Sequence, residues 1–261
     1  MKKIMLGIAA LMGMVGIATA TEITWEGLCK NVLHPLRDNS GDPAAVAKVS
    51  DYVGTLEAKT DGQREMLVRA KVAVFAEQNP EASAEDVFSY AKQCFAEAGF
   101  TAPVTGRMYP PAVMVYWRGT AWKAEMYKVL KGIPGVEKSG DMGGFAQSAG
   151  KYEEACEIYI GTRATWAYAQ TIRMAAEKLG AEKAFGYAKR IMAQGVTMRA
   201  ADAKAMMDVV YAKLLTAEGV KPAEMKEFLQ TANRKFTVCM PSDPTAWEPV
   251  VAGIRNALDA F

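Results

Sequence analysis

The sequence is poor in histidine, with a single one, His34, among 261 residues. Hydrolases of the Ser-His-Asp and Cys-His types need an imidazole base, so any such mechanism would have to use this residue. His34 precedes Pro35 at the end of an expected helix, which favours a helix-end or surface position. The sequence also lacks a Gly-x-Ser-x-Gly motif. We therefore predict no catalytic residue.

The sequence also lacks the motifs of metal and cofactor sites. It has no Cys-x-x-Cys-His motif and no closely spaced Cys or His ligands. The acidic segment Glu153 to Glu157 would suit a di-iron bundle only with Glu-x-x-His pairs on two helices, so we interpret it as a solvated helix face. The glycine-rich segment 139–144 has no P-loop Lys-Ser/Thr. No metal or cofactor is predicted.

Charge of one sign does not accumulate in this chain. Outside residues 1–20, 29 Lys and Arg face 29 Asp and Glu, with no run of like charge. A neutral chain has little attraction for phosphate backbones. Nucleic acid is therefore not an expected partner.

A long apolar run of about 20 residues, as a membrane-spanning helix requires, is also missing. The chain begins with Lys2 and Lys3, a shorter apolar stretch from Ile4 to Ile17, and Ala18-Thr19-Ala20. This pattern is typical of a signal peptide over residues 1–20 that is cleaved after Ala20. We expect a periplasmic or secreted product with no stable membrane span after cleavage.

The chain has few cysteines, and their even number suggests disulfides in an exported protein. The spacing does not choose among the three possible pairings, and four reduced, buried thiols are the alternative. We expect at least one disulfide among four candidates: Cys29, Cys94, Cys156 and Cys239.

Helix signals dominate the remaining pattern, and alternating strand patterns are almost absent. The segment 112–117 is the one place where a strand could occur, but we interpret it as the start of a helix that reaches Lys131. Further helices are expected near 145–160, 163–179, 181–194, 198–217, 222–235 and 249–260. The prediction is an all-α fold of about nine helices, in antiparallel hairpins stacked as a solenoid-like or bundle-like array.

Two regions are expected, separated by a Gly- and Pro-containing segment at 132–144. The first is an N-terminal helical region, residues 21–131, and the second is a repeat-like region, residues 145–261. One continuous domain is the alternative. Tyr-Ala-Lys recurs at Tyr90, Tyr187 and Tyr211, which fits either a degenerate repeat or ordinary Ala-rich helices.

One stretch carries a family resemblance. Gly150, Tyr152, Ala155 and Tyr159 resemble the helix junction and second helix of a tetratricopeptide repeat, and Met142-Gly143 lies where that family carries Leu-Gly. The match covers residues 142–160 only. It departs from the family where Ala146 replaces an expected aromatic and where no proline follows. The resemblance implies solenoid-like packing, and families of this kind mostly bind proteins or peptides.

Aromatic residues are concentrated between 109 and 127, beside cationic side chains. Tyrosine and tryptophan offer large rigid faces with a polar tip, which suit sugar rings and peptide side chains. The alternative is that these residues form the buried face of one helix. The candidate ligand-binding patch consists of Tyr109, Tyr116, Trp117, Arg118 and Trp122.

The absence of catalytic side chains favours an exported protein–protein interaction or scaffold protein that performs no chemistry. A glycan hydrolase with paired carboxylates is one alternative, because a sequence does not show whether two acids lie close together. A small-ligand carrier is the other.

Overall fold

The computed structural model describes residues 23–100, 117–136, 139–195 and 197–261, and this part of the chain is helical without any strand. The all-α prediction is therefore confirmed, and the helices form a packed array. The predicted signal peptide, residues 1–20, lies outside the described residues. Within the described ranges, none of the helices is both long and apolar enough to cross a membrane.

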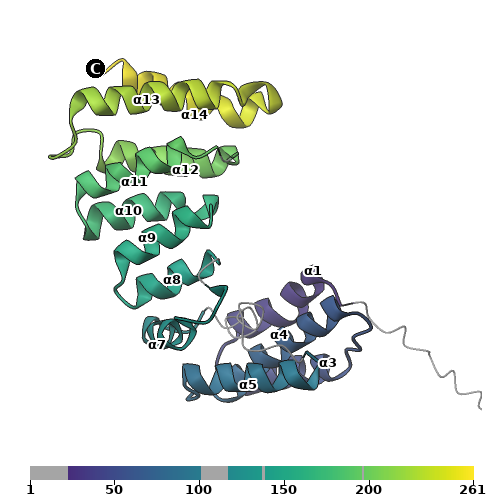
Figure 1. The fold of residues 1–261 in the computed structure, drawn as a ribbon. Coiled ribbons are helices and arrows are strands. Elements are labelled where there is room, and N and C mark those ends of the chain that lie inside the picture. The colour runs from purple at the N-terminus through teal and green to yellow at the C-terminus, as the bar shows by residue number, and fades with distance from the viewer. Residues whose placement is uncertain (1–22, 101–116, 137–138, 196) are drawn as a thin grey trace, which may run out of the picture.

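The first group of helices, which we call the N-terminal unit, spans residues 23–100 (Figure 1). Asp42 and Thr60 cap two of its helices through their side chains, and Ser83 and Asp86 form the capping box that starts α5. Its elements are α1 (Trp25–Leu28), the π-helical turn η1 (Cys29–Leu33), α2 (His34–Asp38), α3 (Pro43–Gly54), α4 (Asp61–Gln78) and α5 (Ala84–Glu97).

The second group, which we call the array, stacks helix upon helix away from the N-terminal unit (Figure 1). Helices α10, α12 and α14 pack directly against one another in sequence, and α9, α11 and α13 follow one another in a second row. The elements are α7 (Thr120–Leu130), α8 (Asp141–Ser148), α9 (Tyr152–Gly161), η3 (Thr165–Ala167), α10 (Tyr168–Lys178), α11 (Ala181–Ala193), α12 (Ala200–Lys213), α13 (Pro222–Thr237), η4 (Met240–Ser242) and α14 (Pro244–Leu258).

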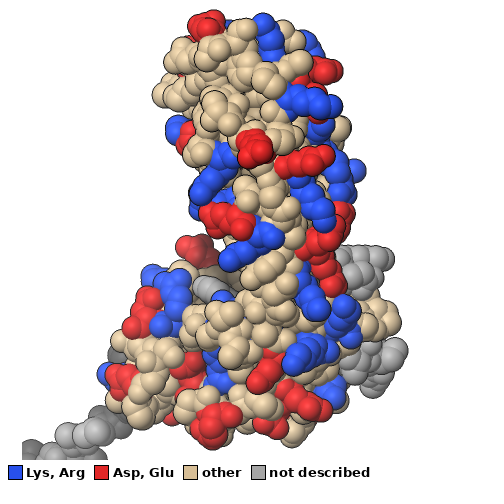
Figure 2. Space-filling view, turned by 90° about the vertical axis from the view of Figure 1, so that its left-hand side faces the viewer, with Lys and Arg blue, Asp and Glu red and all other residues tan. Residues whose placement is uncertain are grey.

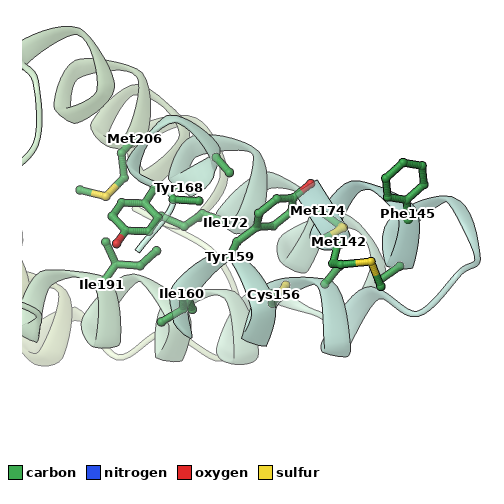
Figure 3. Packing of buried hydrophobic residues seen from close by; sticks show 14 of the residues in the cluster. Met142, Phe145, Cys156, Tyr159, Ile160, Tyr168, Ile172, Met174, Ile191 and Met206 are labelled. Carbon is green, nitrogen blue, oxygen red and sulfur yellow. The ribbon is translucent and has the colours of Figure 1, made fainter. Parts of the chain in front are cut away.

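The array has a continuous apolar core between its helices. Figure 3 shows Tyr168, Ile172 and Tyr159 next to one another in this core, and all three are buried. The methionines of this region fill the same core, as expected for flexible apolar side chains: Met192, Met198, Met206 and Met207 are each at most 5% exposed.

The stretch that resembles a tetratricopeptide repeat folds as the helical hairpin α8–α9. Gly143 packs so closely on Tyr159 that an added Cβ would lie 2.5 Å from the ring. Between the two helices, Gly150 adopts a φ of 73°, a conformation that glycine tolerates better than other residues. The small residue and the aromatic side chain thus hold the two helices close together.

Three helix boundaries differ from the prediction. The expected helix 145–160 is two helices, because Gly150 turns the chain between them. Helix α7 begins at Thr120, so Trp117 and Arg118 precede it. The last helix begins at Pro244, because the Asp243 side chain accepts a hydrogen bond from the Ala246 amide and caps it ahead of Pro249.

The prediction of at least one disulfide is wrong for this structure, in which all four cysteines are free. They lie in η1, α5, α9 and the segment after α13, and none of these elements is a main packing neighbour of another. Cys94 and Cys156 are buried, and Cys156 Sγ lies 3.9 Å from the Thr171 carbonyl oxygen. Burial raises the pKa of the Cys156 thiol to about 12. The alternative of buried, reduced thiols describes these two residues.

Candidate functional site

The predicted aromatic patch does not form one exposed surface among the described residues. Tyr109 and Tyr116 lie outside them. Trp117 donates a hydrogen bond from Nε1 to Glu77 Oε1 at 2.9 Å, which joins it to the end of α4. This contact anchors the chain just before α7 on the N-terminal unit.

Arg118 forms the centre of the same junction. Its guanidinium donates to the carbonyl oxygens of Ala76, Asn79 and Ala82, at and beyond the C-terminal end of α4. It also lies over the Trp122 ring, with 5.6 Å between the guanidinium carbon and the ring centroid. A cation at a helix C-terminus satisfies carbonyl groups that have no partner within the helix. The described part of the patch therefore connects the N-terminal unit to the array.

The other residues singled out by their chemistry have ordinary environments. His34 is exposed at the start of α2. Glu153 pairs with Lys183 and Glu157 with Arg190, so these carboxylates join α9 to α11. Within the described ranges, no three His, Cys, Asp or Glu side chains come together as a metal site would require.

A different part of the array exposes the residue types that are common in binding sites. Four connections lie along its right-hand side in Figure 1, and we call their described residues the loop edge: 131–136, 139–140, 162–167, 194–195, 197–199 and 238–243. Trp166 in η3 is 55% exposed on this edge, and its ring meets the Tyr159 ring edge-on at a centroid distance of 5.7 Å. Tryptophan exposed on a rigid support is frequent among the residues that contribute most to protein interfaces.

A buried acid, Asp202, links Arg199 to Thr165, the residue that precedes Trp166. The Asp202 carboxylate accepts hydrogen bonds from Arg199 Nε at 3.0 Å and Nη2 at 2.8 Å, and from the Thr165 hydroxyl at 3.1 Å. The Asp202 side chain is 9% exposed, whereas that of Arg199 is 75% exposed. Hydrogen bonds from Arg199 lower the pKa of Asp202 below its usual value, so this carboxyl is ionised at neutral pH. The result is a fixed arginine with most of its side chain in solvent.

A second arginine, on the connection that carries Trp166, has a strained backbone. Arg163 has a φ of 56°, and among the described residues no other non-glycine residue has a positive φ. This conformation disfavours a side chain by about 1 kcal/mol or more. Burial raises the pKa of Tyr168, and the positive charge of Arg163 partly offsets this effect. Strain of this kind is often retained where a side chain serves function.

Hydrogen bonds between the ends of successive helices make the loop edge rigid. Gln194 donates to the Ile160 carbonyl at 3.0 Å, and its side-chain oxygen accepts from the Tyr168 hydroxyl at 2.8 Å. Lys235 then donates to the carbonyl oxygens of Gln194 at 2.7 Å and Met192 at 3.1 Å. The C-terminal ends of α9, α11 and α13 are thereby linked one to the next.

The two parts of the molecule carry opposite charge. Residues 23–100 contain eight Lys and Arg against twelve Asp and Glu, a net charge of −4. Residues 117–261 contain 20 against 16, a net charge of +4. The neutrality of the whole chain hides this division, so the array has an attraction for acidic partners that overall composition does not reveal.

The opposite edge of the array, which carries its hairpin turns, has a different surface. Figure 2 shows acidic and basic groups mixed over this side, with an uncharged area at the upper end of the array. Several of the array's charges are paired between helices, as in Lys213 with Glu177 and Lys189 with Glu224. Paired charges on a surface give little recognition of their own.

Arg163, Trp166 and Arg199 were not predicted as binding residues from the sequence. Each lies in the first turn of an expected helix, 163–179 or 198–217, where helical periodicity does not show which side chains stay exposed. The arginine–acid pair Arg199–Asp202, with its spacing of three residues, was a signal that could have been noticed.

No family model, curated protein or solved structure was found to match this chain. The candidate site therefore rests on its own geometry.

Proposed function

We propose that the chain is an exported helical interaction or scaffold protein of the cell envelope, which binds a protein or peptide partner and performs no chemistry. The signal-peptide pattern of residues 1–20 supports export to the periplasm or beyond the cell. The rigid array supports a scaffold role, because helical arrays present extended surfaces for binding.

The observation that carries the proposal is Trp166, which is more than half exposed, together with the exposed Arg199 that Asp202 links to the neighbouring Thr165. Leaving a large aromatic ring in water has a free-energy cost that partner binding would remove. Tryptophan and arginine are also the residue types most enriched among interface positions with large effects.

The alternative functions receive less support from the described residues. Glycosidase chemistry needs two carboxyl groups free to act on a sugar, whereas Glu153 and Glu157 are engaged with basic side chains. A ligand carrier needs a cavity with polar groups that orient its cargo. The apolar hollow of about 330 Å³ near Leu215 and Phe261 offers Thr216 as its one polar side chain.

The test is site-specific photo-crosslinking in the native cell envelope. A benzophenone amino acid replaces Trp166 in one variant and Trp25 in the control, since Trp25 is 50% exposed on the N-terminal unit. We expect a discrete adduct heavier than the chain from position 166 and none from position 25. The absence of an adduct at 166, or the same adducts from both positions, would overturn the proposal.

A further inference from the structure

We propose that the loop edge binds an acidic polypeptide segment that also carries an apolar side chain. The apolar side chain would lie against Trp166, and a carboxylate would bind Arg199. This inference rests on the proposed function, because it names the chemistry of the partner at the same site.

Arg199 has hydrogen-bonding capacity left over. A guanidinium has five N–H donors in a fixed planar arrangement. Asp202 takes one from Nε and one from Nη2, at 3.0 Å and 2.8 Å. The side chain is 75% exposed, so its remaining donors are accessible to solvent. Because Asp202 and Thr165 already fix the orientation, a partner carboxylate meets a preorganised group.

Trp166 offers an apolar surface with a fixed position. An added Cβ on Gly140 would lie 3.7 Å from the Trp166 ring and 3.1 Å from the Ala164 Cβ, so the preceding connection packs closely there. Tyr159 supports the ring from another direction at 5.7 Å. The ring is therefore held on these sides while more than half of the residue stays exposed. An apolar side chain of a partner can cover this exposed part.

The charges around the site favour an acidic partner over a neutral or basic one. Arg163 adds a second positive charge, on the connection that carries Trp166, and the array as a whole carries +4. Asp202 is directed to Arg199, whereas the exposed acids Asp243 on this edge and Asp141 next to it, at the start of α8, oppose the attraction. A basic segment would meet both arginines unfavourably. Charge complementarity thus selects an acidic segment.

The experiment uses three dye-labelled synthetic peptides of equal length, with binding measured by fluorescence polarisation. One carries glutamate with phenylalanine, one glutamine with phenylalanine, and one glutamate with serine. We expect the glutamate–phenylalanine peptide to bind at least about tenfold more tightly than either of the others. We also expect its affinity to fall as salt is raised. Equal binding of the three peptides would overturn the proposal.

Variants of the chain locate the binding. Trp166→Ala and Arg199→Gln should each lose binding of the glutamate–phenylalanine peptide by about tenfold. Trp25→Ala and Arg255→Gln, which change an exposed tryptophan and an exposed arginine elsewhere, should not. Arg163→Gly removes a guanidinium while relieving backbone strain, so we expect it to weaken binding without lowering the unfolding free energy. Equal losses in the control variants would place the peptide elsewhere.

The two proposals fail in different ways. In one outcome, crosslinking at position 166 gives an adduct with another protein while the peptide assay shows no preference for the acidic peptide. That result would refute the proposed acidic partner and would still support the interaction function. An adduct with the mass of two chains would show that a second copy of this chain binds at the loop edge. It would overturn the proposal that the partner is a different, acidic polypeptide. The absence of any adduct would remove the proposed function itself.

Discussion

The junction between the N-terminal unit and the array is held differently from the junctions inside the array. Among the described residues, Trp117 and Arg118, just before α7, make the polar contacts to the end of α4, while α5 packs against α7. Inside the array, apolar packing, ion pairs and hydrogen bonds between helix ends repeat from one helix to the next. A distributed junction tolerates the loss of one polar contact, whereas a concentrated junction depends on a few side chains.

The largest change in stability is expected at Gly143, where α8 and α9 pack too closely for a side chain. Gly143→Ala should destabilise the protein by about 3 kcal/mol, because its Cβ would overlap the buried Tyr159 ring. Urea unfolding of the variant measures the change. Gly186→Ala is the matched control in α11, because its Cβ would meet nothing within 4 Å. The control should raise the unfolding free energy by about 0.5–1 kcal/mol, and equal effects at the two positions would contradict the packing described.

The next effect tests the concentrated junction. Arg118→Met should cost about 2 kcal/mol, because it removes the charged donor from carbonyl groups at the end of α4. We expect the N-terminal unit to unfold at a lower temperature than the array, so that calorimetry shows two transitions. Lys128→Met, at an exposed position of α7, is the control and should leave one transition. A single transition for Arg118→Met would mean that other contacts suffice.

The corresponding change inside the array should have a smaller effect. Lys235→Met removes the donor from Met192 and Gln194, and we expect a loss of about 1 kcal/mol. The transition should stay single, because α13 keeps its packing on α14 and the contact between Phe228 and Phe185 on α11. Calorimetry under the same conditions measures this. A split transition here would remove the distinction between the two kinds of junction.

The smallest effect has the opposite sign. Arg163→Gly should raise the unfolding free energy by about 1 kcal/mol at most, because glycine adopts a φ of 56° without steric cost. Urea unfolding checks the gain. Arg173→Gly, within α10, is the control and should destabilise by about 1 kcal/mol. A loss of stability in Arg163→Gly would show that the guanidinium contributes to folding.

The sequence predicts the helical architecture well because local signals define it. The capping box at Ser83 and Asp86 and the turn at Gly180 are legible in the residues themselves. Boundaries fail where two signals compete, as at Gly150, which ends one helix inside a continuous helical pattern. The tetratricopeptide resemblance singled out both Gly143 and Tyr159, but their close contact was not predicted and is seen only in the structure.

The candidate site is less predictable. Trp117 and Trp166 have similar local sequences, each with a polar neighbour, but different environments. Trp117 bonds to the buried acid Glu77, whereas Trp166 faces solvent. Exposure depends on which connections meet at one edge of the array, and this is a property of the stack as a whole. The patch at 109–127 was predicted from its aromatic composition, which does not show which rings are exposed.

The division of charge between the two parts has a kinetic consequence. A molecule with −4 at one end and +4 at the other behaves as a large electric dipole, although its total charge is near zero. Such a molecule rotates during diffusion so that its array leads towards an acidic surface and its N-terminal unit trails. Salt would then slow the encounter with a partner much more than it would shorten the life of the complex.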